Sequence, residues 1–164
     1  MVSVKVFLSG SVQKGEHDTR SSQYFWSDAE EATLRNLLHG INVEILNPNR
    51  VTIDQSQSIA RFKADLKLLI DADVVVVDAR TKKGLGVGAE LMMAHYEYIP
   101  VLALCPNGSE YRRNGNTHAF IAGLTSGVFG TLNEIAHEIS CLLEGGQIPR
   151  KQRGLLTSNL RYDI

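Results

Sequence analysis

The feature that most constrains the fold is an unbroken β-branched run, Val74 to Val77, followed by a short loop and the glycine-rich sequence GLGVGAE. A strand made only of valine has no polar face, so it must be covered on both sides, as in the centre of a parallel sheet. The glycine-rich sequence opens a helix that we expect from about Val87 to Tyr98. A buried strand followed by a helix is the unit from which α/β folds are built.

The rest of the chain alternates in the same way. Strands are predicted at residues 2–9, 41–46 and 100–105, and helices at 27–39, 58–70 and 131–143. Ser27 with Glu30, and Thr131 with Glu134, have the spacing of a capping box. Residues 119–129 fit a short helix and a fifth strand, whereas the polar segment 107–116 is expected to be mobile. The predicted fold is therefore α/β, a doubly wound, mainly parallel five-stranded sheet with helices on both faces, flavodoxin-like or Rossmann-like.

Length and charge limit the classes of function. The 164 residues fit one domain, which we place at residues 1–146, followed by a basic tail at 147–164. The net charge is −1, with 17 basic and 18 acidic residues, so a nucleic-acid partner is not expected. No apolar run approaches the roughly 20 residues that span a membrane, and the N-terminus lacks the order of a signal peptide. These patterns favour a cytoplasmic protein.

Metal binding is not expected either. Cys105 and Cys141 lie far apart, and neither forms a Cys/His cluster with the spacing of metal ligands. Both are interpreted as reduced thiols. His95, His118 and His137 also lack partners at ligand spacing.

Ligands of such folds bind beyond the carboxyl ends of the strands, where the strand order reverses. Three loops are expected there, at residues 10–23, 47–57 and 79–88. The first contains Ser9-Gly10-Ser11 with Gln13 and Lys14, a possible cradle for an oxyanion or phosphate. It also contains His17, Asp18 and Arg20, which suit contacts to a base or a phosphate. The alternative for all of them is a solvated polar turn.

Two carboxylates are candidates for chemistry. Glu90 is expected in the first turn of its helix, where the helix dipole favours an ionised carboxylate that could act as a nucleophile. The alternative is an acidic residue placed there for the dipole alone. Asp65 lies in the helix at 58–70, where an aspartate is ordinarily solvated. The glycines also match a dinucleotide fingerprint, but weakly, because they follow the third strand rather than the first.

Three segments together resemble a known family. FLSGS at residues 7–11, ADLKLLIDADVVVVDAR at 64–80 and GLGVGAE at 84–90 are similar to the nucleoside 2-deoxyribosyltransferase superfamily. Within it, the chain resembles most the nucleoside 5′-monophosphate N-glycosidases, which comprise deoxynucleotide and cytidylate hydrolases. The similarity runs from about Val4 to Leu143.

The resemblance implies an activity and a set of site residues. Glu90 would be the nucleophile that attacks the anomeric carbon, and Asp65 the acid/base group near the leaving base. Gly10, Ser11, Gly86 and Gly88 would line the sugar-phosphate site. No cofactor is implied. The family is usually a homodimer whose partner subunit completes the pocket, and the segment at 118–124 would reach across, so that His118 faces the partner's phosphate.

The chain departs from the family pattern at three places. Phe7 stands where deoxynucleotide hydrolases carry a tyrosine, which resembles the cytidylate-type members and points to a ribose substrate. Gln13, beside Lys14, replaces an expected arginine. Gly84, preceded by Lys82 and Lys83, replaces an expected serine. Lysines hold a phosphate as point charges, without the fork of an arginine.

Three functions follow as hypotheses. The first is an N-glycosidase of a nucleoside 5′-monophosphate, ranked first because Lys14, Lys82 and Lys83 favour a phosphorylated substrate. The second is a nucleoside 2-deoxyribosyltransferase that uses the same covalent intermediate. The third is a nucleotide-binding module without turnover. Two carboxylates in one site disfavour the third, because a phosphate site gains nothing from negative groups.

Overall fold

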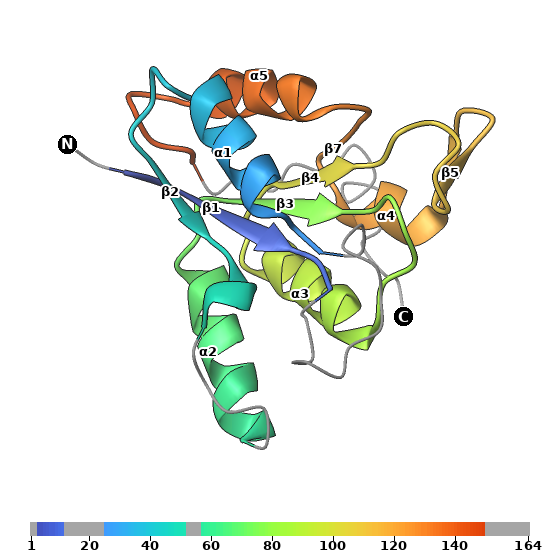
Figure 1. Cartoon of the computed structure of the whole chain (residues 1–164), viewed down its shortest axis with the longest axis horizontal. Coiled ribbons are helices and arrows are strands. Elements are labelled where there is room, and N and C mark those ends of the chain that lie inside the picture. Colours follow the sequence, from blue (N-terminus) through green and yellow to red (C-terminus); the bar gives the residue numbers. More distant parts are fainter. Residues whose placement is uncertain (1–2, 12–24, 52–56, 150–164) are drawn as a thin grey trace, which may run out of the picture.

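The computed structural model describes residues 3–11, 25–51 and 57–149 (Figure 1). Its main sheet has five parallel strands in the order β2-β1-β3-β4-β7. Their bounds are β1 Val4–Ser9, β2 Val43–Leu46, β3 Val74–Asp78, β4 Val101–Leu104 and β7 Gly127–Phe129. The predicted doubly wound α/β fold is therefore confirmed, with a flavodoxin-like strand order.

Helices cover both faces of the sheet (Figure 1). The helices are α1 Asp28–Leu37, α2 Ser58–Ile70, α3 Leu85–Tyr96, α4 Ala119–Leu124 and α5 Leu132–Leu142, with a short 3-10 helix, η3, at Pro48–Arg50. One apolar cluster joins Val74 and Val76 to residues of α1 and α5. A second joins Val75 and Val77 to residues of α2, α3 and α4. The two faces of the valine strand thus enter two separate cores, as its lack of a polar face requires.

The strand order places the switch point between β1 and β3. From β1 the chain moves to β2 at one edge, then returns to build β3, β4 and β7 on the other side of β1. The carboxyl ends of β1 and β3 consequently flank the switch point, which is where such folds hold their ligands. The side chains at the ends of these two strands, Ser9 and Asp78, are both fully buried.

Local sequence signals are confirmed at the helix starts. Ser27 with Glu30 and Thr131 with Glu134 both form capping boxes. The ambiguous segment at 119–129 is indeed a short helix, α4, followed by the fifth strand, β7.

The segment at 107–116, which was predicted to be mobile, has regular structure. Its residues enter a two-stranded hairpin formed by β5 Arg112–Arg113 and β6 Asn116–Thr117. Asn114 and Gly115 both have positive φ and form the turn between the two strands, which suits these residue types.

The C-terminal end of the described chain packs on the domain. Ile148 is buried in the cluster shared with α1 and α5. Most of the predicted basic tail, residues 150–164, lies outside the described residues. Both cysteines are free thiols, Cys105 buried and Cys141 exposed. Among the helices of the described ranges, none has the length and apolar character needed to cross a membrane.

Candidate functional site

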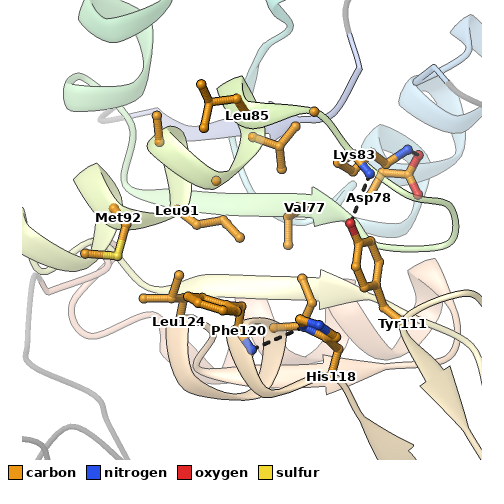
Figure 2. A pocket seen from close by; sticks show the side chains of 15 residues that line it. Val77, Asp78, Lys83, Leu85, Leu91, Met92, Tyr111, His118, Phe120 and Leu124 are labelled. Atoms are coloured by element: carbon orange, nitrogen blue, oxygen red, sulfur yellow. Dashed lines mark hydrogen bonds and ion pairs between the residues drawn. The ribbon is translucent and has the colours of Figure 1, made fainter.

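A buried ion-pair cluster holds the loop that follows β3. The carboxylate of Asp78, which is 0% exposed, accepts hydrogen bonds from the backbone N–H of Arg80 at 3.1 Å, from its Nε at 2.8 Å and from Lys83 Nζ at 2.8 Å. Arg80 also pairs with Glu30 at the start of α1. The backbone N–H of Lys83 donates to the hydroxyl of Tyr111 at 3.0 Å (Figure 2). The loop that leads into α3 is therefore stabilised by contacts with Asp78, Glu30 and Tyr111.

This cluster changes the role of one predicted phosphate-binding lysine. The side chain of Lys83 is only 3% exposed, and its ammonium lies against Asp78 and Thr81. An ammonium already paired with a buried carboxylate contributes little net positive charge to a ligand. Lys82, by contrast, is exposed. Lys83 therefore stabilises the loop that leads into α3. Its pairing with Asp78 weakens the argument that the lysines of this loop favour a phosphorylated substrate.

Glu90 is held at the end of β1. Its Oε2 accepts a hydrogen bond from Ser9 Oγ at 2.6 Å. Burial is the largest influence on this carboxyl and raises its pKa to about 7, whereas the hydrogen bond from Ser9 opposes the rise. The prediction that Glu90 lies in the first helical turn is wrong. The helix begins at Leu85, two residues earlier than expected, so Glu90 lies in the second turn, where the dipole does little to keep it ionised.

Asp65 approaches from α2. Its Oδ2 lies 3.3 Å from Nε of Arg61, one helical turn earlier, and its side chain is 19% exposed. Burial raises the pKa of Asp65, while the charge of Arg61 and its hydrogen bond lower it. The other oxygen, Oδ1, is buried and has no hydrogen-bond partner within the described ranges. Asp65 is therefore not the solvated surface aspartate that is ordinary for such a position.

The two carboxylates lie near enough to influence each other. The charge of Asp65 contributes to the raised pKa of Glu90. Two like charges at one site titrate as a pair, so one of them tends to hold a proton near neutral pH. Such a pair offers one carboxylate and one carboxylic acid, the combination that glycosyl-transfer chemistry uses.

Three predicted site residues lie at the end of β1 or just after it. Gly10 packs under Trp26: a Cβ at Gly10 would lie 3.1 Å from Cδ1 and from Nε1 of the indole, so a larger residue at this position would require the indole to shift by a few tenths of an ångström. Ser11 is buried. Phe7 is fully buried in the apolar cluster beneath α2 and α3. Its contact with a substrate stays a prediction.

A second group of predicted residues lines a separate cavity. This cavity, about 480 Å³, lies between α3 and α4, and Gly84, Gly88 and His118 are among the residues that line it (Figure 2). Its other walls are mainly apolar, and Leu85 and Phe120 at its rim are strongly exposed. Neither Glu90 nor Asp65 lines it. Gly86, which is four residues before Glu90, shares a helix face with that carboxylate instead.

The structure thus divides the predicted site. Glu90, Asp65 and the end of β1 form one group, and the cavity residues form another. Gln13, Lys14, Asp18 and Arg20 lie outside the described residues, so their roles stay predictions. Within the described ranges no cluster of three or more His, Cys, Asp or Glu side chains is arranged to hold a metal ion.

Three contributions were missed by sequence reasoning. Ser9 suggested only a phosphate cradle, although its position at a strand end gives it access to Glu90. Arg61 precedes Asp65 by four residues, a spacing that favours an ion pair on a helix and could have been noticed. Tyr111 belongs to the segment expected to be mobile, and no sequence signal connects it to Lys83.

Comparison with known proteins identifies the fold. No protein-family model matches the chain, and a search of curated proteins finds no match. Among solved structures, a conserved protein from Enterococcus faecalis V583 is similar with a TM-score of 0.61 and 21% identity, covering 87% of this chain and 100% of that one. A 2-deoxyribosyltransferase from Bacillus psychrosaccharolyticus is similar with a TM-score of 0.54 and 14% identity, covering 81% of this chain and 90% of that one. The chain therefore has a flavodoxin-like fold shared with a nucleoside deoxyribosyltransferase.

Proposed function

We propose that the protein breaks the N-glycosidic bond of a nucleoside or nucleoside 5′-monophosphate through a covalent glycosyl–Glu90 intermediate. The observation that carries the proposal is a pair of partly buried carboxylates: Glu90, which accepts a hydrogen bond from Ser9 at the end of β1, and Asp65, whose charge raises the pKa of Glu90. β1 borders the switch point of the sheet, where folds of this kind bind ligands. The fold shared with a 2-deoxyribosyltransferase supports the same chemistry.

The reaction has two steps. An ionised Glu90 oxygen attacks the anomeric carbon, the carbon–nitrogen bond breaks, and the electron pair leaves with the base. Asp65 in its acid form gives its proton to the departing base. In the second step Asp65, now a carboxylate, takes a proton from the acceptor as this attacks the anomeric carbon and frees Glu90. Water as acceptor gives a free sugar, and a second base gives a new nucleoside.

Hydrolysis of a nucleoside 5′-monophosphate is the first candidate. Exposed Lys82 and the resemblance of the glycine loop to nucleotide N-glycosidases favour it, and the buried Phe7, which has no hydroxyl, favours a ribose sugar. Base exchange between deoxynucleosides is the second candidate. It is favoured by the fold shared with the 2-deoxyribosyltransferase and by the loss of Lys83 as a free cation.

One panel of assays tests both candidates. We expect chromatography to show release of free base from one or a few of the common ribo- and deoxyribonucleoside monophosphates. The matching nucleosides serve as controls for the phosphate. A parallel set with a second free base added detects exchange. Exchange without release in water would favour the transferase over the hydrolase, and neither product from any substrate would contradict the proposed function.

Removing the hydroxyl of Ser9 is expected to shift the pH dependence. The mechanism needs Glu90 ionised and Asp65 protonated, so kcat/KM should follow a bell-shaped pH profile, one limb of which reports the ionisation of Glu90, whose pKa is about 7. Ser9→Ala removes a hydrogen bond that favours the ionised carboxylate, so this limb should move to higher pH by about one unit. Rates measured from about pH 5 to 9 check this. A limb that stays in place, or moves to lower pH, would exclude Ser9 as the group that tunes Glu90.

A further inference from the structure

Arg61 connects three parts of the candidate site. Its Nε lies 3.3 Å from Oδ2 of Asp65, its Nη1 donates to the carbonyl of Val51 at 3.2 Å, and its Nη2 donates to the carbonyl of Pro48 at 2.6 Å. The side chain is only 15% exposed. One guanidinium thus fastens α2 to the turn that follows β2 and, at the same time, holds the carboxylate of Asp65.

This arrangement treats the two oxygens of Asp65 differently. Oδ2 faces a permanent cation that donates to it, so a proton on Oδ2 would have to displace that contact. Oδ1 is buried and has no hydrogen-bond partner among the described residues. An unsatisfied buried oxygen is costly unless a ligand or a proton occupies it. A proton carried by Asp65 therefore belongs on Oδ1.

We propose that Arg61 is a positioning residue that orients Asp65 and confines its transferable proton to Oδ1. The inference rests on the proposed function, since the proton has a use only if a base must be protonated as it leaves. A lysine at position 61 would keep the charge but could not span one carboxylate and two carbonyls in a planar fork. The planar guanidinium of Arg61, rather than its charge alone, is therefore the property that orients Asp65.

A purely structural role for Arg61 makes different predictions. If Arg61 only connected α2 to the turn after β2, its removal would lower stability, and it would lower activity equally with or without Asp65. A positioning residue acts through Asp65, so its removal should have no further effect once that carboxyl is gone. Within the described ranges, the charged group that influences the pKa of Asp65 is Arg61 on its own helix, and the charge of Asp65 in turn raises the pKa of Glu90 on α3.

Kinetics of five variants separate the two roles. We expect Arg61→Gln to lower kcat roughly 10- to 100-fold with KM changed less than about threefold, and Arg61→Lys to recover only part of the loss. In the Asp65→Asn background, Arg61→Gln should cause less than a twofold further loss. Lys63→Gln, an exposed cation on the same helix, is the matched control and should behave as wild type. Equal losses from Arg61→Gln with and without Asp65 would overturn the proposal.

A titration tests the contact between Arg61 and Asp65 without an activity assay. The carboxyl carbon of Asp65, followed by NMR in the labelled protein, should titrate at higher pH in Arg61→Gln and in Arg61→Lys than in wild type, with the smaller change in the lysine variant. Glu90→Gln variants of each protein remove the coupled second titration. An unchanged titration of Asp65 would overturn the proposal that Arg61 acts on this carboxyl. If Asp65 titrates as expected but no substrate releases base, the proposed function is wrong, whereas the ion pair between Arg61 and Asp65 is supported.

Discussion

Replacing Glu90 with glutamine is expected to abolish base release and yet to stabilise the fold above neutral pH. Glutamine keeps the size of the side chain and an oxygen that accepts from Ser9, but it cannot attack a sugar. Loss of a nucleophile typically lowers kcat by on the order of 10⁴- to 10⁶-fold. Residual activity within tenfold of wild type would exclude Glu90 as the nucleophile.

The stability gain follows from the pKa of Glu90. Its value in the folded protein is raised from 4.5 to about 7, so the folded state binds the proton more tightly than the unfolded chain does. Stability is therefore lost as pH rises through this range, and glutamine avoids the loss. We expect Glu90→Gln to gain about 2–3 kcal/mol more at pH 8.5 than at pH 5. Urea unfolding at the two pH values measures the difference.

The control for this gain is an exposed carboxylate. Glu44 on β2 is exposed, and Glu44→Gln should change stability by less than about 0.5 kcal/mol at either pH. If Glu90→Gln gained no more stability than Glu44→Gln at high pH, the carboxyl of Glu90 would not be held in the desolvated surroundings that raise its pKa.

Replacing Asp78 with alanine is expected to destabilise the protein strongly. The change leaves the buried ammonium of Lys83 and the guanidinium of Arg80 without their shared carboxylate. Removing one partner of a buried ion pair costs about 3–5 kcal/mol, because the remaining buried charge loses the carboxylate that offset its desolvation. The midpoint of urea unfolding should fall accordingly, and the loop that leads into α3 should lose its order.

The chain contains a matched exposed pair for comparison. Lys5 pairs with Asp71 at the other end of the sheet, where the Asp71 side chain is 59% exposed. Asp71→Ala should cost less than about 1 kcal/mol, because exposed ion pairs contribute little. Equal losses from the two alanine variants would show that Asp78 does not hold a buried charge cluster.

The sequence predicted the layers of this fold because its strongest signals are local. Four consecutive valines have only one stable environment, a sheet centre covered on both faces, and capping-box spacing marks the helix starts at Ser27 and Thr131. The start of α3 was misplaced, since glycine is a weak helix former and nothing before Val87 signals a cap. That two-residue error placed Glu90 in the first turn of the helix, whereas it lies in the second.

The site was harder to predict, because its contacts join residues far apart in the chain. Glu90 and Asp65 were identified through a family resemblance, but the hydrogen bond from Ser9 to Glu90 spans 81 positions. Lys83 looked like a free cation because no sequence pattern reveals that Asp78 is buried beside it. The bond from Lys83 to Tyr111 depends on a hairpin whose strands are only two residues long.

Trp26 gives this protein a built-in optical probe. It is the only tryptophan of the chain, it is 5% exposed, and its indole N–H donates to the carbonyl of Ser9 at 3.0 Å. The guanidinium of Arg80 lies 5.5 Å from the ring centroid. All indole emission therefore arises beside the residue that holds Glu90. A shift in its wavelength or intensity reports events at the end of β1 in the unlabelled protein, in real time and with any candidate substrate.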